Sequence, residues 1–226
     1  MPLLLTLCAG AQDSVCRPLA AAAWATPAAL TASGAAITFH PTWGTLNTRV
    51  RDNVQQWRNE SVLNGRAIRI DNYTQYAPLA SMYVLKVCGV PSRHSYADMS
   101  RRAAMCYAMV FFGSTATKAW CQVPRPGARP TRNSFFSGHT ATVFAGAEML
   151  RMEYRHVSPW IGVGAYGVST LTGLLRIYND RHWLGDVLAG AGAGILCAKL
   201  SYWLCDRFQQ EQQGHKPLSP YHGFRL

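Results

Sequence analysis

The second half of this 226-residue chain holds three short polar segments whose side chains suit the cleavage of a phosphate ester without a metal. They are residues 118–126 (KAWCQVPRP), 137–139 (SGH) and 176–186 (RIYNDRHWLGD). Their cations, Lys118, Arg125 and Arg176, can hold a tetrahedral phosphate from several directions, the arginines through a planar fork and the lysine as a point charge. Phosphoryl transfer also needs a nucleophile and an acid for the leaving oxygen, and two histidines can divide these roles.

The order and spacing of these residues resemble the type 2 phosphatidic acid phosphatases, a family that shares a superfamily with bacterial class A acid phosphatases and vanadium haloperoxidases. The family pattern is KxxxxxxRP, then PSGH, then SRxxxxxHxxxD. Lys118 is followed by Arg125 at the family spacing. Arg176 is followed by His182 and Asp186, again at the family spacing. The resemblance covers about residues 72–205.

Two positions depart from the family pattern. Phe136 stands where the family has proline, and Leu175 stands where it has serine. The first change removes a rigid turn residue before the SGH tripeptide, and the second removes a hydroxyl that would help to hold phosphate. Neither position makes or breaks a bond, so we expect changed affinity or geometry rather than loss of activity.

The resemblance implies a role for each residue of the motifs. His182 is expected to be the nucleophile that takes the phosphoryl group as a phosphohistidine. Asp186, four residues later, is expected to fix the histidine tautomer and to stabilise the imidazolium. His139 is expected to protonate the leaving alcohol and then to activate water. The remaining motif residues are expected to bind phosphate: Lys118, Arg125, Arg176, Ser137 and Gly138.

The start of the predicted helix near Thr140 places Ser137 and Gly138 at a helix N-terminus, which favours an anion. The motifs contain only Asp180 and Asp186 as carboxylates, and Asp186 is committed to His182. We therefore expect no metal and no cofactor. Three further arginines either widen the positive field over an anionic headgroup or form a solvated loop face: Arg129, Arg132 and Arg181.

Composition indicates one domain and no nucleic-acid partner. The net charge is +11, but the cations lie in loops between apolar runs and form no recognisable nucleic-acid motif, so an anionic lipid or a membrane surface fits better. The seven cysteines include no CxxC pair and are expected to pack as small apolar side chains, Cys121 among them. No obligate protein partner is indicated. We assign residues 1–11 to a signal-peptide remnant, 12–208 to the phosphatase domain and 209–226 to a polar tail.

Six apolar stretches predict an all-α bundle of about six core helices with the active site at one end. They are residues 19–39, 72–90, 103–117, 137–150, 157–175 and 187–205. Residues 157–175 carry no charge over a length that crosses a bilayer. Mean hydropathy is only −0.04, because many positions are small residues that suit either a membrane bundle or a soluble helical core. We favour the membrane bundle.

Residues 46–57 predict an additional amphipathic helix, with Leu46, Val50, Val54 and Trp57 on one face. It either lies on the membrane surface or covers the core. Asp71, Tyr73 and Gln75 follow it closely, and the sequence alone assigns them no role.

The predicted function is hydrolysis of a lipid phosphate monoester or pyrophosphate, of the lipid A, undecaprenyl diphosphate or phosphatidate type. Localisation in a bacterial inner membrane with a periplasm-facing site follows from resemblance to the bacterial members. This orientation agrees with a cleaved signal only if residues 19–39 do not span. The alternatives are a soluble periplasmic acid phosphatase of broad specificity and a vanadium haloperoxidase, which would use the same anion cradle.

Overall fold

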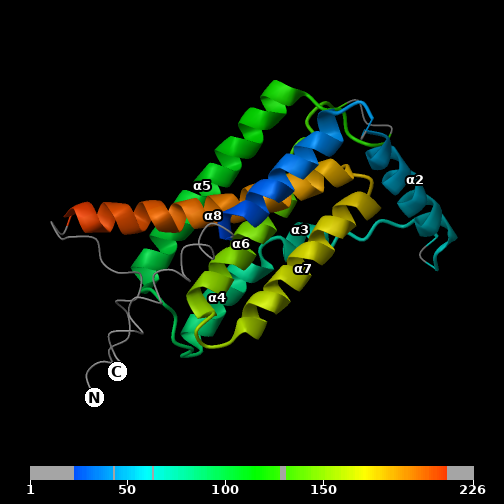
Figure 1. The fold of residues 1–226 in the computed structure, drawn as a ribbon. Helices are drawn as coiled ribbons and strands as arrows, with labels where there is room; N and C mark the ends of the chain where they lie inside the picture. Colours follow the sequence, from blue (N-terminus) through cyan, green and yellow to red (C-terminus); the bar gives the residue numbers. More distant parts are fainter. Residues whose placement is uncertain (1–22, 43, 63, 128–130, 213–226) are drawn as a thin grey trace, which may run out of the picture.

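The computed structural model describes residues 23–42, 44–62, 64–127 and 131–212, and within these ranges it contains helices and no strand. Residues 23–39 are helical. The labelled helices are α2 (Gly44–Glu60), α3 (Asp71–Thr74), α4 (Ala77–Val87), α5 (Tyr96–Cys121), α6 (Gly138–Tyr154), α7 (Pro159–Tyr178) and α8 (Leu184–Gln212) (Figure 1). The described part of each apolar stretch is mostly helical, although residues 72–90 are divided between α3 and α4. The predicted all-α bundle is confirmed. The proposed signal remnant at 1–11, most of the tail and Arg129 lie outside the described residues.

Serine caps fix the starts of three core helices. The hydroxyl of Ser95 accepts from Asp98 N at 3.2 Å, that of Ser137 from Thr140 N at 3.4 Å, and that of Ser158 from Trp160 N at 3.3 Å. Because Ser95 caps α5, this helix begins well before the apolar run at 103–117 that predicted it.

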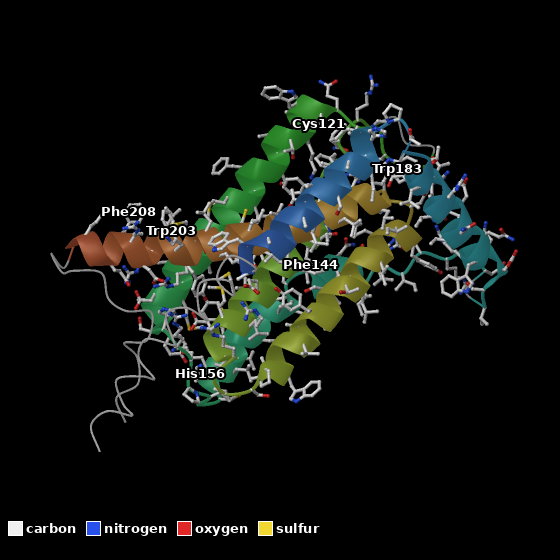
Figure 2. All side chains as sticks on the ribbon, in the orientation of Figure 1. Cys121, Phe144, His156, Trp183, Trp203 and Phe208 are labelled. Carbon is white, nitrogen blue, oxygen red and sulfur yellow. The ribbon has the colours of Figure 1, made fainter. Side chains whose placement is uncertain are left out.

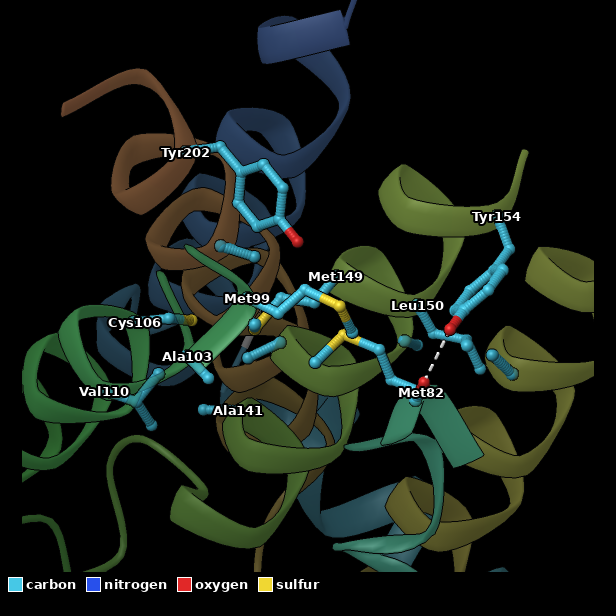
Figure 3. Close-up of a cluster of buried hydrophobic side chains, with 14 of the residues drawn as sticks. Met82, Met99, Ala103, Cys106, Val110, Ala141, Met149, Leu150, Tyr154 and Tyr202 are labelled. Carbon is cyan, nitrogen blue, oxygen red and sulfur yellow. Dashed lines mark hydrogen bonds between the residues drawn. The ribbon is translucent and has the colours of Figure 1, made fainter. Parts of the chain in front are cut away.

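Helix α6 lies at the centre of the bundle and packs against α4, α5, α7 and α8. Figure 3 shows the buried cluster in which Met82, Met99 and Met149 meet, with Tyr154 OH donating to Met82 O at 2.8 Å. Methionine fills irregular gaps between helices, and here it does so among small alanine side chains. The core is therefore closely packed although few of its residues are large and aliphatic.

Glycines bring α8 to within backbone contact of α6. A Cβ placed on Gly190 would lie 2.6 Å from Ser137 O, and one on Gly194 would lie 3.0 Å from Ala145 N. Gly34 brings the helix of residues 23–39 equally close to α8 on another side, at Ala189. No larger residue fits at these crossings, so the start of α6 is held at a fixed distance from α8.

The helices alternate in direction, and this brings the polar loops to one end of the bundle. Cys121 and Trp183 lie at this end, whereas His156 lies at the other (Figure 2). Trp183 Nε1 donates to Pro124 O at 2.8 Å, which joins the loop after α5 to the loop after α7. The three polar segments, far apart in sequence, are thus neighbours in space.

One helix among the described residues, Leu184–Gln209 within α8, is long and apolar enough to cross a bilayer. The charge-free stretch 157–175 was predicted to have spanning length, but α7, which holds residues 159–175 of it, is not among the helices apolar enough over that length to cross a bilayer. Its glycines, serines and threonines suit helix packing more than contact with lipid.

Helix α2 docks onto α7 and α8 through polar side chains rather than through its predicted apolar face. A position on the membrane surface stays a prediction. Asn47 is its buried residue, while Leu46 is 41% and Trp57 64% exposed. Val50 and Val54 are half-buried. The predicted apolar face is therefore split: its ends point outward, and the polar residues beside Val50 and Val54 bind the bundle.

Candidate active site

His182 lies in the turn between α7 and α8, facing a carboxylate and a hydroxyl. Its Nδ1 is 3.5 Å from Asp186 Oδ2 and 3.4 Å from Ser134 Oγ. Ser134 in turn donates to Asp186 Oδ2 at 2.5 Å, and Trp183 N donates to the same oxygen at 2.9 Å. His182 is 3% exposed, and Ser134 and Asp186 are fully buried. With Nδ1 directed at Asp186 and Ser134, the ring nitrogen left for chemistry is Nε2.

Burial lowers the pKa of His182 to about 4, and Asp186 opposes this shift by hydrogen bonding and by its charge. The imidazole is therefore neutral at physiological pH, as a nucleophile must be. Asp186 Oδ1 is buried and has no hydrogen-bond partner within the described ranges. Its other oxygen carries the contacts to Ser134, Trp183 and His182.

Lys118, in the last turn of α5, reaches the start of α6. A Cβ on Gly138 would lie 3.4 Å from Lys118 Nζ, so the ammonium group sits beside the helix N-terminus where anions are favoured. Ser137 is fully buried and serves as the cap of α6. Its N–H donates to Asp186 O at 3.1 Å. The Ser137 amide is thus engaged by the backbone of α8, and phosphate binding by Ser137 and Gly138 stays a prediction.

Arg176 is held by a carboxylate that no sequence motif marks. Arg176 Nη1 donates to Asp71 Oδ2, and both side chains are buried. Asn179 Nδ2 donates to the other oxygen of Asp71 at 3.3 Å. Arg176 Nε is buried without a partner among the described residues. Asp71 thus fixes one edge of the guanidinium and leaves another edge for a phosphate oxygen.

Arg125 lies on the loop after α5 and completes the set of cations. Its Nε donates to Asn133 Oδ1 at 2.8 Å, and its N–H donates to Thr131 O at 3.1 Å. The positive charge of Arg125 contributes to the lowered pKa of His182, as does that of Arg176. The three predicted phosphate-binding cations therefore lie close to one another and to the two histidines.

His139 lies in the first turn of α6, with Nε2 3.3 Å from Asn72 Oδ1. Burial, followed by the charges of Arg176 and His182, lowers its pKa to about 4. A bound phosphate dianion would offset these cations and favour the protonated form that a general acid requires. His139 also lines a cavity of about 400 Å³ between α4, α5 and α6. Apolar side chains such as Leu79, Val110 and Phe111 form much of its wall.

The residues that depart from the family pattern lie around this site. Phe136 is buried against Phe135, with ring centroids 6.2 Å apart, and Leu175 is half-buried in the last turns of α7. Arg132 is exposed and Arg181 half-buried. Cys121 packs against the core, which confirms the prediction for this thiol.

Three residues that contact the predicted site were missed or left without a role: Ser134, Asp71 and Asn72. Ser134 precedes the SGH tripeptide closely but has no spacing signal of its own. Asp71 and Asn72 belong to α3, far away in sequence. Among the described residues, no group of three or more His, Cys, Asp or Glu side chains has a geometry suited to a metal ion.

Comparison with known proteins identifies relatives of the chain. The chain is 36% identical over 171 residues to the lipid A 1-phosphatase of Porphyromonas gingivalis, a match that covers 75% of this chain and 38% of that protein. It therefore spans about two fifths of the length of this curated relative. Two crystal structures share the fold: LpxE of Aquifex aeolicus and the first transmembrane PAP2 type phosphatidylglycerolphosphate phosphatase from Bacillus subtilis.

The Aquifex structure has a TM-score of 0.52 and 21% identity, covering 70% of this chain and 95% of its own. The Bacillus structure has a TM-score of 0.54 and 15% identity, covering 80% of this chain and 96% of its own. The PAP2 superfamily model matches residues 50–210, which include all three polar segments and both histidines. The chain belongs to the PAP2 superfamily.

Proposed function

We propose that this protein is a metal-independent phosphatase that hydrolyses a lipid phosphate monoester or pyrophosphate through a phosphohistidine. The observation that carries the proposal is the arrangement of His182, Asp186 and Ser134 near three cations that come from two separate segments of the chain. Membership of a phosphatase superfamily supports the same reaction.

The reaction proceeds in two steps. His182 Nε2 attacks phosphorus while Lys118, Arg125 and Arg176 neutralise the phosphate oxygens. The bond to the leaving oxygen breaks, and His139 gives that oxygen its proton. Water then attacks the phosphohistidine, His139 takes a proton from the water, and inorganic phosphate leaves with Nε2 restored. Asp186 stabilises the positive charge that His182 carries during both steps.

The substrate we propose is lipid A or a related anionic lipid phosphate. The name of the Porphyromonas relative supports this choice, as does the net charge of +11. The apolar cavity beside His139 lies where a leaving group would emerge and suits its hydrocarbon part. We propose an inner-membrane location with the site facing the periplasm, and α8 as a membrane-spanning helix.

The test is phosphate release from lipid A by purified protein in excess EDTA, with His182→Ala as the inactive control. Activity in the chelator, abolished by the substitution and inhibited by vanadate, is expected. Vanadate adopts the five-coordinate geometry of the transition state and would bond to Nε2. Strict dependence on added divalent metal, without vanadate inhibition, would overturn the proposal. Activity on small esters alone, in protein extracted without detergent, would instead indicate a soluble acid phosphatase.

A further inference from the structure

Helix α2 holds the loop that carries His182 from both sides. Before the histidine, Arg51 Nε donates to Asp180 Oδ1 at 2.7 Å and Arg51 Nη2 donates to Asp180 Oδ2 at 3.1 Å. After it, Gly185 N donates to Asn47 Oδ1 at 2.9 Å. Gln55 Nε2 donates to the carbonyl oxygens of the last two residues of α7, at 3.3 and 3.2 Å. These bonds connect segments far apart in the sequence, so α2 is a tertiary support of this loop.

The Arg51–Asp180 pair is the charged part of this support. Its bidentate geometry is the strongest form of an arginine–carboxylate interaction, and the two side chains are only 29% and 20% exposed. Asp180 has φ 55°, a left-handed conformation that aspartate and asparagine tolerate better than most residues. The pair therefore stabilises a turn of uncommon backbone geometry two residues before His182.

Asp180 also touches the loop that carries Arg125. A Cβ on Gly127 would lie 2.5 Å from Asp180 Oδ2, so this loop passes directly over the carboxylate. Gly127 itself has φ 83°, which a side chain would strain. One carboxylate thus contacts α2, the His182 loop and the Arg125 loop.

We propose that Arg51 and Asp180 act as a positioning pair that aligns His182 with the bound phosphate. The inference rests on the proposed function, because it assigns the pair a role through the nucleophile. The pair itself lies outside the phosphate-binding set and does not bind substrate. Lys118 and Arg176 are held by other elements, and Arg125 is held within its own loop by Asn133 and Thr131. Loosening the His182 loop should therefore impair phosphoryl transfer more than phosphate binding.

The test uses Arg51→Ala, Asp180→Asn and the double variant in detergent-solubilised protein. Asparagine tolerates the left-handed backbone as aspartate does, so Asp180→Asn isolates the charge. Each variant is expected to lose about tenfold in kcat, the effect of a displacement below about 1 Å, with KM changed less than about twofold. The double variant should lose no more than either single one, because the two residues act as a unit. Arg49→Ala, on the exposed side of α2, is the matched control and is expected to stay within about twofold of the wild type.

Inhibition separates positioning from a general loss of structure. Vanadate must bond to His182, whereas inorganic phosphate needs only the cations. The inhibition constant for vanadate should therefore rise with the loss of kcat, while that for phosphate stays constant. If the vanadate inhibition constant were equal in variant and wild type while the variant unfolded at a lower temperature, the pair would have a purely structural role and the inference would be overturned. Additive losses in the double variant, or a change confined to KM, would do the same. A wild type without phosphatase activity would refute the proposed function as well.

Discussion

Replacing Asp186 by asparagine tests the charge that the site places behind His182. The amide has nearly the shape of the carboxylate and can still accept from Trp183 N and Ser134, whose contacts are 2.9 and 2.5 Å. What disappears is the negative charge 3.5 Å from His182 Nδ1. That charge matters little to the neutral imidazole of the free enzyme. It matters most when Nε2 bonds to phosphorus and the ring becomes positive.

The magnitude follows from this distance. Two unit charges 3.5 Å apart attract by about 5 kcal/mol at an effective dielectric constant of about 20. Hydrogen bonds that remain in the variant offset part of the loss, so we expect a barrier about 3–4 kcal/mol higher. At about 1.4 kcal/mol per factor of ten, kcat should fall by about two to three orders of magnitude.

The assay is steady-state phosphate release from a lipid phosphate, with single-turnover measurement of the phosphohistidine step. Asp206→Asn is the matched control, because Asp206 is also an α8 carboxylate but pairs with Arg102 rather than with His182. A loss of less than about tenfold in Asp186→Asn, with normal folding, would show that this carboxylate does not stabilise the reacting imidazole. A similar loss in Asp206→Asn would attribute the effect to α8 as a whole.

Three further outcomes are expected. His139→Ala should reduce kcat by about 10²–10⁴-fold on alkyl phosphates but much less on nitrophenyl phosphate, whose leaving group needs no acid; an equal loss on both would contradict the role of His139. Because the pKa of His182 is about 4 in the folded protein and about 6.5 when unfolded, the unfolded state binds more protons between these values. The unfolding free energy should therefore fall as pH drops from about 6.5 to about 4. This fall should be smaller in His182→Gln, and an equal pH dependence in the wild type and this variant would refute the argument. Gly190→Ala should cost about 1–3 kcal/mol of stability through collision with Ser137 O, as measured by thermal unfolding, whereas Gly167→Ala, which meets nothing within 4 Å, should not destabilise; similar midpoints would contradict the packing argument.

Much of the fold was predictable because its signals are local. Apolar stretches located the six core helices, and the serine before Gly138 marked the start of α6. The alternation of helices then placed the three polar segments at one end. The predicted helix bounds were less accurate where a helix continues into polar residues. Arg102, for example, belongs to α5 but lies outside the apolar stretch, and it donates to Tyr202 O and Asp206.

The supports of the site were not predictable, because they depend on contacts between distant segments. Asp71 reaches Arg176 across 105 positions and Ser134 reaches Asp186 across 52, and neither has a periodicity or spacing that marks it. The polar contacts by which α2 docks were not predictable for a related reason. Apolar periodicity identifies the face that packs on an apolar core. This helix instead binds polar groups at the end of the bundle: Asn47 accepts from Gly185 N, Arg51 donates to the Asp180 carboxylate, and Gln55 donates to backbone carbonyls of α7.

The glycine contacts of α8 make this helix the common reference for both histidines. The first turn of α8 carries Asp186, which contacts His182. Its next turns pack directly on the backbone at the start of α6, where His139 lies. Helix α8 thus sets the positions of catalytic groups that come from distant parts of the sequence. A side chain at these glycine positions would favour the helical conformation of α8 but push α6 away from it, so the same substitution would both destabilise the packing and misalign the catalytic groups.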